Sequence, residues 1–348
     1  MRLVQVGVGR WGHDWLKTVF PQVPLAQLVA CVDSSPERRA AVVEEGMVPP
    51  RNFHASFDAA LGSVSFDGVV VTTELSAHVP VVRAALEAGK HVLVEKPFAP
   101  SLEEARSLAQ LAAQRGLTLM VSQNYRFFPA VRLVQRLVAE RTFGDVRFVV
   151  LQFRRFSPAT NGQGGHHRWR APLLQDMAVH HFDLLRATLG RGALSIACRT
   201  WNPGWSWFAD DPEGCALISF EDGVQVSYSG SWLNADQTPW AGHWRMALDE
   251  GELWWTSRGS ADGLGDEEVR FCDRRGTWTR LDLPQLELSG RAGCLAEFVD
   301  AVESGRTPEC DASDNLSTMS LVYGAMASAA ASGAEVELGT QQPAARER

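Results

Sequence analysis

Two short elements within the first hundred residues could together support redox chemistry. Gly7-Val8-Gly9-Arg10-Trp11-Gly12 follows one apolar run, and Val94-Glu95-Lys96-Pro97 stands at the end of another. Glycines at this spacing allow a tight turn and a close approach of the backbone to a pyrophosphate. An ammonium group at a later strand end can stabilise negative charge on a reacting oxygen. The combination predicts a dinucleotide site with a charged group in the same domain.

The glycine motif has the strand–turn–helix context that a dinucleotide site requires. Residues 2–6 form an apolar strand pattern, and residues 13–20 carry apolar side chains at helical spacing. In such a turn Gly7 permits the sharp bend, Gly9 lets the backbone approach the pyrophosphate, and Gly12 lets the helix pack against the strand. The pyrophosphate is then expected at the unpaired amides of the helix start.

The next apolar run ends at Asp33, 21 residues beyond Gly12, where a carboxylate binds the ribose hydroxyls of adenosine. A carboxylate there repels a 2′-phosphate and favours NAD over NADP. Three polar residues follow that could receive such a phosphate, so NADP stays open: Ser34, Arg38 and Arg39. The alternative interpretation is a chance glycine turn beside an aspartate that merely ends a strand.

Lys96 lies just beyond the C-terminal end of a predicted strand, where ligands collect in open α/β sheets. Pro97 restricts the backbone of the residue before it, so the lysine side chain is aimed rather than left mobile. An exposed surface lysine is the simpler interpretation of the residue alone. Its place at the strand end favours a function.

A second chemical cluster stands on a predicted helix, Asp176-Met177-Ala178-Val179-His180-His181-Phe182-Asp183. Asp176 and His180 are four residues apart and share one helix face, and Asp183 continues the stripe. The remaining positions are mostly apolar. A polar stripe on an otherwise apolar helix needs a reason, and a base with its orienting carboxylate is one.

Two alternatives remain for this helix. In the first, His180 is a hydrogen-bonded core residue and the aspartates are caps or ion pairs. In the second, the cluster binds a metal with His166 and His167 nearby. We expect no metal, because hydride transfer to nicotinamide needs none and no other ligand spacing is diagnostic.

Composition limits the classes of protein and partner. A chain of 348 residues is longer than a single hydrophobic core usually supports, so two domains are expected. The net charge of −8 includes no basic block, which argues against nucleic acid or an anionic membrane as partner. Without a signal sequence or a membrane-length apolar stretch, and with six scattered cysteines, the chain is expected in the cytoplasm with reduced thiols.

The fold class follows from the order of the patterns. Apolar strand runs alternate with helices through residues 1–123, which predicts an N-terminal Rossmann domain with a doubly wound parallel sheet. Short alternating segments then predict an α+β domain over 124–340, with a large, mostly antiparallel open sheet covered on one face. Its C-terminal helices are able to pack back on the first domain. Residues 341–348 are expected to be a disordered tail.

Taken together, these residues resemble the glucose–fructose oxidoreductase and inositol dehydrogenase family, Gfo/Idh/MocA. The resemblance covers nearly the whole chain. It rests on the glycine motif, Glu95-Lys96-Pro97, Asn124-Tyr125-Arg126-Phe127 and the helix from Asp176 to Asp183. Two departures concern the site: Ala178 replaces a usual glycine, and Glu74 replaces a proline or small residue near the nicotinamide.

The resemblance implies an NAD(P)-dependent oxidoreductase acting on a hydroxyl-bearing carbon of a sugar or polyol. It implies Lys96, Asp176 and His180 as catalytic residues, and a homodimer or homotetramer formed through the sheet face. The residues expected at the cofactor are Gly7, Gly9, Arg10, Trp11, Gly12, Asp33, Ser34, Arg38, Thr72, Thr73, Glu74, His78, Glu95 and Lys96. Those expected at the substrate are Asn124, Tyr125, Arg126, Trp169 and His181.

Two other functions stay open. Some relatives in this family hydrolyse glycosidic bonds through transient oxidation by tightly held NAD, which would leave no net reduced nicotinamide. A non-catalytic, dinucleotide-binding regulator is the other. The joint presence of Lys96, Asp176 and His180 argues against a regulator, which has no need of proton transfer. The sequence does not identify the substrate, because specificity depends on a few side chains on loops.

Overall fold

A computed structural model describes residues 1–159, 165–259 and 267–339, and its chain divides into two compact units. The first comprises Met1–Asn124 and Glu287–Leu316, and the second Tyr125–Leu286 with Ser317–Arg348. The sequence placed one boundary after residue 123, and the structure divides the chain one residue later. Residues 287–316 group with the first unit because their helix buries apolar side chains there. The expected tail, 341–348, lies outside the described residues.

The first unit is built on a six-stranded parallel sheet in the order β3-β2-β1-β4-β5-β6. Its strands are β1 (Arg2–Val6), β2 (Gln27–Val32), β3 (Phe53–His54), β4 (Gly68–Val71), β5 (His91–Val94) and β6 (Leu119–Val121). The order reverses between β1 and β4, the point in doubly wound sheets where ligands bind beyond the carboxyl ends of the strands. The predicted doubly wound sheet is confirmed.

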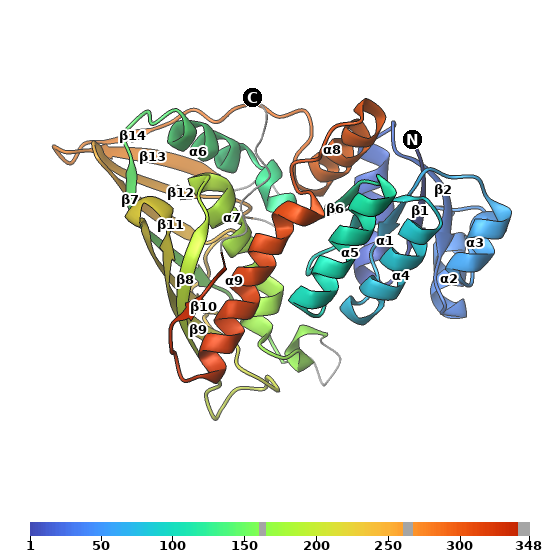
Figure 1. Ribbon diagram of the computed structural model, residues 1–348, viewed down its shortest axis with the longest axis horizontal. Helices are drawn as coiled ribbons and strands as arrows, with labels where there is room; N and C mark the ends of the chain where they lie inside the picture. The colour runs from blue at the N-terminus through green and yellow to red at the C-terminus, as the bar shows by residue number, and fades with distance from the viewer. Residues whose placement is uncertain (160–164, 260–266, 340–348) are drawn as a thin grey trace. The chain divides into compact units, whose positions relative to one another are not determined.

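Helices connect these strands and cover the sheet (Figure 1). They are α1 (Arg10–Asp14), η1 (Trp15–Val19), η2 (Phe20–Gln22), α2 (Pro36–Glu44), η3 (Pro50–Asn52), α3 (Phe57–Ser63), α4 (Leu75–Glu87), α5 (Leu102–Arg115) and α8 (Gly290–Ser304). The start of α5 is specified locally, because the Ser101 hydroxyl accepts the Glu104 amide at 3.2 Å. Helix α8 packs against β5 and η1, and buries Leu295 and Phe298.

The second unit contains a nine-stranded sheet in the order β14-β13-β12-β11-β7-β10-β9-β8-β15. Its strands are β7 (Val146–Arg154), β8 (Ala193–Trp201), β9 (Glu213–Phe220), β10 (Gln225–Ser231), β11 (His243–Leu248), β12 (Gly251–Thr256), β13 (Glu268–Asp273), β14 (Trp278–Arg280) and β15 (Val336–Glu337). Every pairing is antiparallel except that of β7 with β10. The predicted mostly antiparallel sheet is therefore confirmed.

Helices cover one face of this sheet. The helical segments are η4 (Asn124–Phe127), α6 (Pro129–Ala139), η5 (His166–Arg168), η6 (Leu173–Ala178), α7 (Val179–Leu189), η7 (Glu221–Gly223) and α9 (Ala312–Ala330), with α6, α7 and α9 on the same side (Figure 1). Side chains alternate accordingly: Ile218 is fully buried, whereas its neighbour Leu217 is 64% exposed. Trp244 and Trp255 stack in the core with ring centroids 4.4 Å apart.

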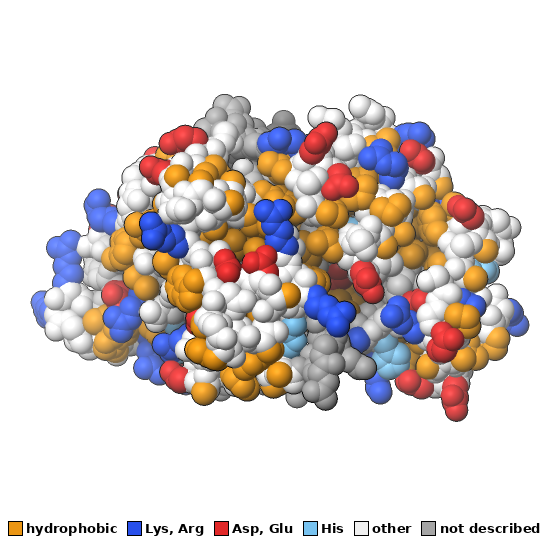
Figure 2. All heavy atoms as spheres, turned by 90° about the horizontal axis from the view of Figure 1, so that it is seen from below, with side chains coloured by type: hydrophobic (Ala, Val, Ile, Leu, Met, Phe, Trp, Pro, Cys, Tyr) orange, Lys and Arg blue, Asp and Glu red, His pale blue; other side chains and the backbone are white. Residues whose placement is uncertain are grey.

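The helices, the cysteines and the surface each show a general property of the chain. None of the helices in the described part of the chain has both the length and the apolar character needed to cross a bilayer. None of the six cysteines, all of which lie in the described ranges, takes part in a disulfide. Basic and acidic side chains both occur across the face drawn in Figure 2, with apolar side chains between them.

Candidate functional site

The loop after β1 requires glycine at two of its three motif positions. Gly7 has a φ of +92°, and a Cβ there would lie 2.8 Å from the amide nitrogen of Thr73. A Cβ on Gly12 would lie 2.0 Å from the carbonyl oxygen of Gly7. At Gly9 a Cβ would make only an ordinary contact, 3.5 Å from Arg38 Nη1. The described neighbours thus exclude any side chain at Gly7 and Gly12. At Gly9 there is space on the open side of the loop for a ligand to approach the backbone.

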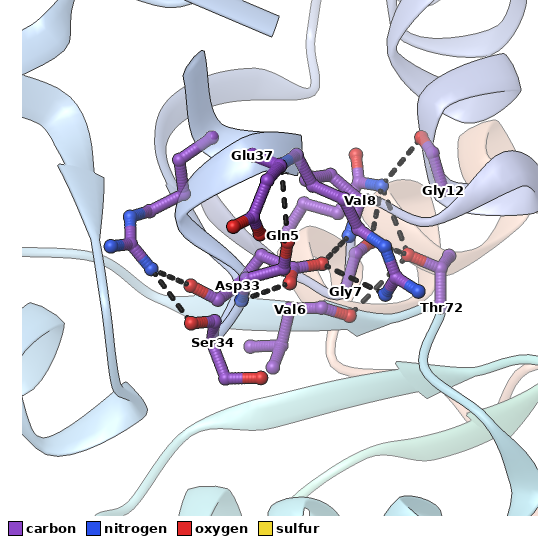
Figure 3. A network of polar contacts seen from close by, with 12 residues as sticks. Gln5, Val6, Gly7, Val8, Gly12, Asp33, Ser34, Glu37 and Thr72 are labelled. Carbon is purple, nitrogen blue, oxygen red and sulfur yellow. Dashed lines mark hydrogen bonds and ion pairs between the residues drawn. The ribbon is translucent and has the colours of Figure 1, made fainter. Parts of the chain in front are cut away.

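Two buried side chains hold this loop in place (Figure 3). The Gln5 amide donates to the carbonyl oxygen of Gly12 at 2.8 Å and to the Thr72 hydroxyl at 2.9 Å. That hydroxyl donates in turn to the carbonyl oxygen of Gly7 at 2.6 Å. Thr72, expected as a cofactor contact, therefore supports the loop. Gln5 was not singled out from the sequence, although a polar residue inside an apolar strand run was a usable signal.

Asp33 binds the same loop from the end of β2. Its Oδ2 accepts the Val8 amide at 2.8 Å, and its Oδ1 accepts the Ser35 amide at 2.9 Å (Figure 3). Because a carboxylate has about four acceptor sites, two bound amides leave capacity for ribose hydroxyls. The carboxylate thus orders the glycine loop and is still able to bind a diol.

The two arginines that follow Asp33 have different roles. Arg39 donates to the carbonyl oxygens of Asp33 and Ser34, at 2.7 and 3.0 Å, so its guanidinium is occupied by backbone. Arg38 is exposed, and its Nη1 lies 3.7 Å from Asp33 Oδ2. Since Arg38 also lies beside Gly9, it is the better placed of the two for a phosphate.

These residues fit a dinucleotide. The loop provides a backbone surface that side chains at Gly7 and Gly12 would fill, and helix α1 begins directly after Gly9. The Thr73 hydroxyl is buried and has no hydrogen-bond partner among the described residues. A buried hydroxyl without a partner costs free energy, which a bound polar group would recover. The fit rests on this hydroxyl and on the open side of Gly9.

Glu95 positions the start of the Lys96 segment. The buried carboxylate accepts the Trp15 indole N–H at 2.8 Å through Oε1, and the Lys96 amide at 3.1 Å through Oε2. Ser122 also approaches Oε1 at 3.4 Å. Lys96 itself is half-buried, and its peptide bond to Pro97 is cis. Glu95, expected at the cofactor, thus holds the backbone of the proposed catalytic lysine.

His78 links the segments that follow β4 and β5. Its Nδ1 lies 2.9 Å from the carbonyl oxygen of Pro97, and its Nε2 lies 3.2 Å from that of Thr73. Burial lowers the pKa of His78, although the neighbouring carbonyl oxygens oppose that effect. The ring is therefore a bridge between the Thr73 and Lys96 segments.

Three further residues expected at the cofactor lie nearer the surface. Arg10 is exposed, and Glu74 is the exposed residue that precedes α4. The Trp11 ring is packed under the Arg291 guanidinium, 4.3 Å from ring centroid to Cζ. Arg291 in turn forms an ion pair with Asp14. These contacts anchor Trp11 to helix α8 within the first unit.

The predicted histidine helix begins with a π-helical turn. Asp176 is half-buried in η6 (Leu173–Ala178), and His180 is buried in the first turn of α7. Single π-turns within helices often occur at functional sites, because they shift the direction of side chains relative to a regular helix. The sequence predicted one continuous helix here, and the π-turn is an addition that residue spacing did not reveal.

An aromatic ring fixes one face of His180. The rings of Tyr125 and His180 are parallel within 5°, with centroids 3.9 Å apart. The Arg258 guanidinium lies over the same tyrosine, 4.6 Å from its centroid, and donates to its hydroxyl. Tyr125 is thus in contact with the candidate base and with an arginine that the sequence did not indicate.

Arg126 supports the fold, in contrast to its expected contact with substrate. Its side chain is 2% exposed, and its Nε and Nη2 donate to the two carboxylate oxygens of Asp183 at 2.7 and 2.6 Å. The Thr318 hydroxyl donates to the same carboxylate at 3.0 Å. The alternative interpretation of Asp183 as part of an ion pair is therefore correct.

His181 also has a supporting position where a substrate contact was expected. The residue is fully buried, with Nε2 3.0 Å from the carbonyl oxygen of Trp240 and Nδ1 3.3 Å from the Tyr228 hydroxyl. It therefore holds the backbone of Trp240. Of the other expected substrate contacts, Asn124 is buried and Trp169 is half-buried at the end of η5.

The histidines considered for a metal site have another partner. His166 Nε2 and His167 Nε2 each lie 2.8 Å from the Ser157 hydroxyl. Over the ranges 1–159, 165–259 and 267–339, no three His, Cys, Asp or Glu side chains are grouped so that they could hold a metal ion.

Comparisons with known proteins agree along the chain. Residues 1–123 match the family model of the Gfo/Idh/MocA oxidoreductases, described as an NAD-binding Rossmann fold. Residues 131–253 match the model of the C-terminal domain of the same family. The chain is 26% identical to D-apiose dehydrogenase from Paraburkholderia graminis, over 91% of this chain and 84% of the relative. It is 26% identical to D-xylose 1-dehydrogenase (NADP(+)) 2 from Haloferax volcanii, over 93% and 96%.

Solved structures share the fold. An oxidoreductase from Agrobacterium radiobacter, in complex with NAD+, L-tartaric acid and magnesium, superposes with a TM-score of 0.85 at 20% identity. The match covers 97% of this chain and 98% of that one.

Proposed function

Because the chain belongs to the Gfo/Idh/MocA family of oxidoreductases, we propose that it is an NAD(P)-dependent dehydrogenase acting on a sugar, polyol or related small molecule. The reaction transfers hydride between nicotinamide and a hydroxyl-bearing carbon. The observation that carries the proposal is the loop after β1, where only glycine fits at Gly7 and Gly12 and where Asp33 binds the loop amide. Relatives named as sugar dehydrogenases support it.

The preferred cofactor is NAD. Asp33 carries a negative charge beside the expected ribose, which disfavours a 2′-phosphate. Arg38 is exposed and next to Gly9, so NADP remains usable at lower affinity. The relative from Haloferax volcanii is named as NADP-dependent.

We assign the chemistry to three residues. When bound, nicotinamide supplies the hydride acceptor or donor. His180 takes the proton from the substrate hydroxyl, and the Tyr125 ring restricts how the imidazole turns. Asp176, one turn earlier on the helix, orients that imidazole and stabilises its charged form. Lys96, whose backbone Glu95 holds, donates a hydrogen bond to the reacting oxygen and stabilises its developing charge.

The assembly is proposed to be a homodimer or homotetramer formed through the bare face of the nine-stranded sheet. That face exposes Leu217 and Phe148, at 64% and 40% of their surface. Large exposed apolar side chains on one surface are typical of interaction sites. Light scattering on the purified chain and on Leu217→Glu tests this, and a monomer in both would overturn it. Six cysteines without a disulfide among the described residues support a reducing compartment, the cytoplasm.

The activity is tested by supplying NAD or NADP with a panel of polyols, aldoses, inositols and sugar acids. Absorbance of reduced nicotinamide is followed, and nucleotide binding is measured separately. Signal with at least one substrate is expected. A cofactor that survives purification, without net reduced nicotinamide but with glycoside cleavage, would instead identify the NAD-dependent glycosidase. Nucleotide binding without either reaction would favour the regulator.

A further inference from the structure

Two arginines approach the same indole beside the candidate base. The Cζ of Arg155 lies 3.9 Å from the centroid of Trp240, and that of Arg258 lies 5.7 Å from it. Both arginine side chains are half-buried. All three residues belong to the second unit, and His181 fixes the backbone of Trp240 through its carbonyl oxygen. Both guanidiniums therefore contact one indole whose backbone is held in place.

Neither guanidinium has a carboxylate partner among the described residues. Arg155 donates to the Gln237 side-chain oxygen at 3.1 Å, and Arg258 donates to the Tyr125 hydroxyl. The Glu267 carboxylate accepts the backbone amide of Arg258 at 3.3 Å rather than its guanidinium. Within the described ranges, the hydrogen-bond partners of these two guanidiniums are thus neutral.

Several other arginines of the same unit do form ion pairs. Arg154, the neighbour of Arg155, forms an ion pair with Asp236 at 3.1 Å, and Arg270 forms one with Glu268 at 2.7 Å. Acidic partners are therefore available in this unit, and Arg155 and Arg258 are two half-buried arginines that the described residues do not pair with one.

This arrangement is unfavourable for the ligand-free protein. Burial lowers the pKa of Arg155; Tyr125 opposes that effect, and the charge of Arg258 adds to it. Arg258 also has a φ of +56°, in the left-handed region that residues other than glycine rarely adopt. Such outliers persist where the surrounding structure maintains them, and they occur often at ligand sites. An anion bound between the guanidiniums would offset the repulsion.

The arginine pair is connected to the candidate base, His180, through the ring of Tyr125. Tyr125 stacks on His180 at 3.9 Å, and Arg258 lies over Tyr125 at 4.6 Å. One ring thus contacts both the candidate base and one arginine of the pair, so a substrate hydroxyl at His180 and a second group at Arg258 would have Tyr125 as a common neighbour.

We propose that Arg155 and Arg258 bind an anionic group of the substrate, so that the substrate is a sugar or polyol carrying a carboxylate or a phosphoryl group. The planar, multiply donating guanidinium matches the oxygens of both groups. This inference rests on the proposed function, because it concerns the substrate of the same site. It adds a chemical class that the activity alone does not specify.

Binding is tested without relying on turnover. Titration calorimetry in saturating NAD uses three probe series: neutral sugars such as galactose, the corresponding acids galacturonate and galactonate, and galactose 6-phosphate. One anionic series is expected to bind more tightly than the neutral sugar, and which one does so distinguishes a sugar acid from a sugar phosphate. Anions that bind no better than galactose would overturn the proposal. That result would leave the dehydrogenase activity itself untouched.

Substitutions then test which arginines bind the anionic group. Arg155→Met and Arg258→Met should each weaken anion binding roughly 10- to 100-fold, the size of a lost hydrogen bond to a charged group. Arg154→Met is the matched control, because that arginine is already paired, and its anion affinity should stay within about twofold of wild type. Equal losses in all three variants would contradict the assignment.

Folding and charge are controlled separately. Arg258→Lys keeps the charge but loses the planar donor array, so it should retain part of the anion affinity. The NAD affinity of every variant reports whether the first unit is intact, and should not change. If Arg258→Lys and Arg258→Met retained wild-type anion affinity, the arginines would be structural cation–π partners and the inference would be wrong.

Discussion

The ring of Tyr125 lies parallel to the imidazole of His180, with centroids 3.9 Å apart and 5° between the planes. Helix α7 supplies the histidine, and the short turn η4 supplies the tyrosine. The stack leaves the imidazole few orientations, so the direction of its nitrogens is set before a substrate arrives. Preorganisation of this kind is what a general base requires.

Removing the Tyr125 ring should therefore slow the reaction. Tyr125→Ala is expected to lower kcat about tenfold. This corresponds to the free energy of one aromatic pair together with the loss of a fixed imidazole orientation. Tyr125→Phe keeps the stack and loses the hydroxyl that Arg258 contacts, so it should raise KM with kcat almost unchanged. Steady-state kinetics of both variants on one substrate make the comparison. Equal losses of kcat in both variants would show that the hydroxyl, rather than the stacked ring, controls the rate.

Charge at Asp33 should set the cofactor preference. Asp33→Asn keeps an oxygen for the Val8 amide and removes the charge, so NADP should gain relative to NAD by about tenfold in kcat/KM. Arg38→Ala should lower NADP use and leave NAD use nearly unchanged, because only the 2′-phosphate needs that guanidinium. An unchanged ratio in Asp33→Asn would mean that its carboxylate only orders the loop.

Two alanine substitutions in the glycine loop should separate folding from binding. Gly12→Ala brings a Cβ to 2.0 Å from the Gly7 carbonyl oxygen, and should reduce the free energy of unfolding by roughly 1–3 kcal/mol or more. Gly9→Ala meets only an ordinary contact, so its melting temperature should match wild type while its NAD affinity falls. Thermal denaturation and NAD titration of both variants test this. Equal melting temperatures would refute the packing argument.

Loss of Arg126 should affect stability rather than specificity. Arg126→Met leaves the Asp183 carboxylate buried without its partner, and breaking a buried pair from one side costs roughly 3–5 kcal/mol. Replacing both residues, as Arg126→Met with Asp183→Leu, should recover much of that loss. Urea denaturation of the three proteins measures the effect. If Arg126→Met kept its stability and lost only substrate affinity, the direct substrate contact expected from the sequence would be reinstated.

Local patterns accounted for most of the fold. The strands of the first unit are short runs that are buried on both sides, and the helix after Ser101 carries its own cap. Such features depend on neighbours in sequence, so composition and spacing reveal them. The segment Leu217-Ile218-Ser219-Phe220 likewise predicted a sheet with one covered face, and in the structure Ile218 is buried beside exposed Leu217.

The roles within the site depended on distant residues, and could not be predicted in this way. Arg258 contacts Tyr125 across 133 positions, and Arg126 meets Asp183 across 57. Nothing near Arg126 in sequence distinguishes a buried ion pair from an exposed substrate contact. The π-turn before His180 is a change in backbone hydrogen bonding that side-chain spacing does not encode.

The proposed hydride transfer depends most on His180 as the proton acceptor. The decisive measurement compares wild type and His180→Ala on the best substrate of the panel, by the rate of nicotinamide reduction at saturating cofactor, with NAD affinity determined in parallel. The expected result is a fall in kcat of roughly 10²–10⁴, typical of a lost general base, with NAD affinity within a few fold of wild type. Turnover close to wild type in His180→Ala would contradict the account.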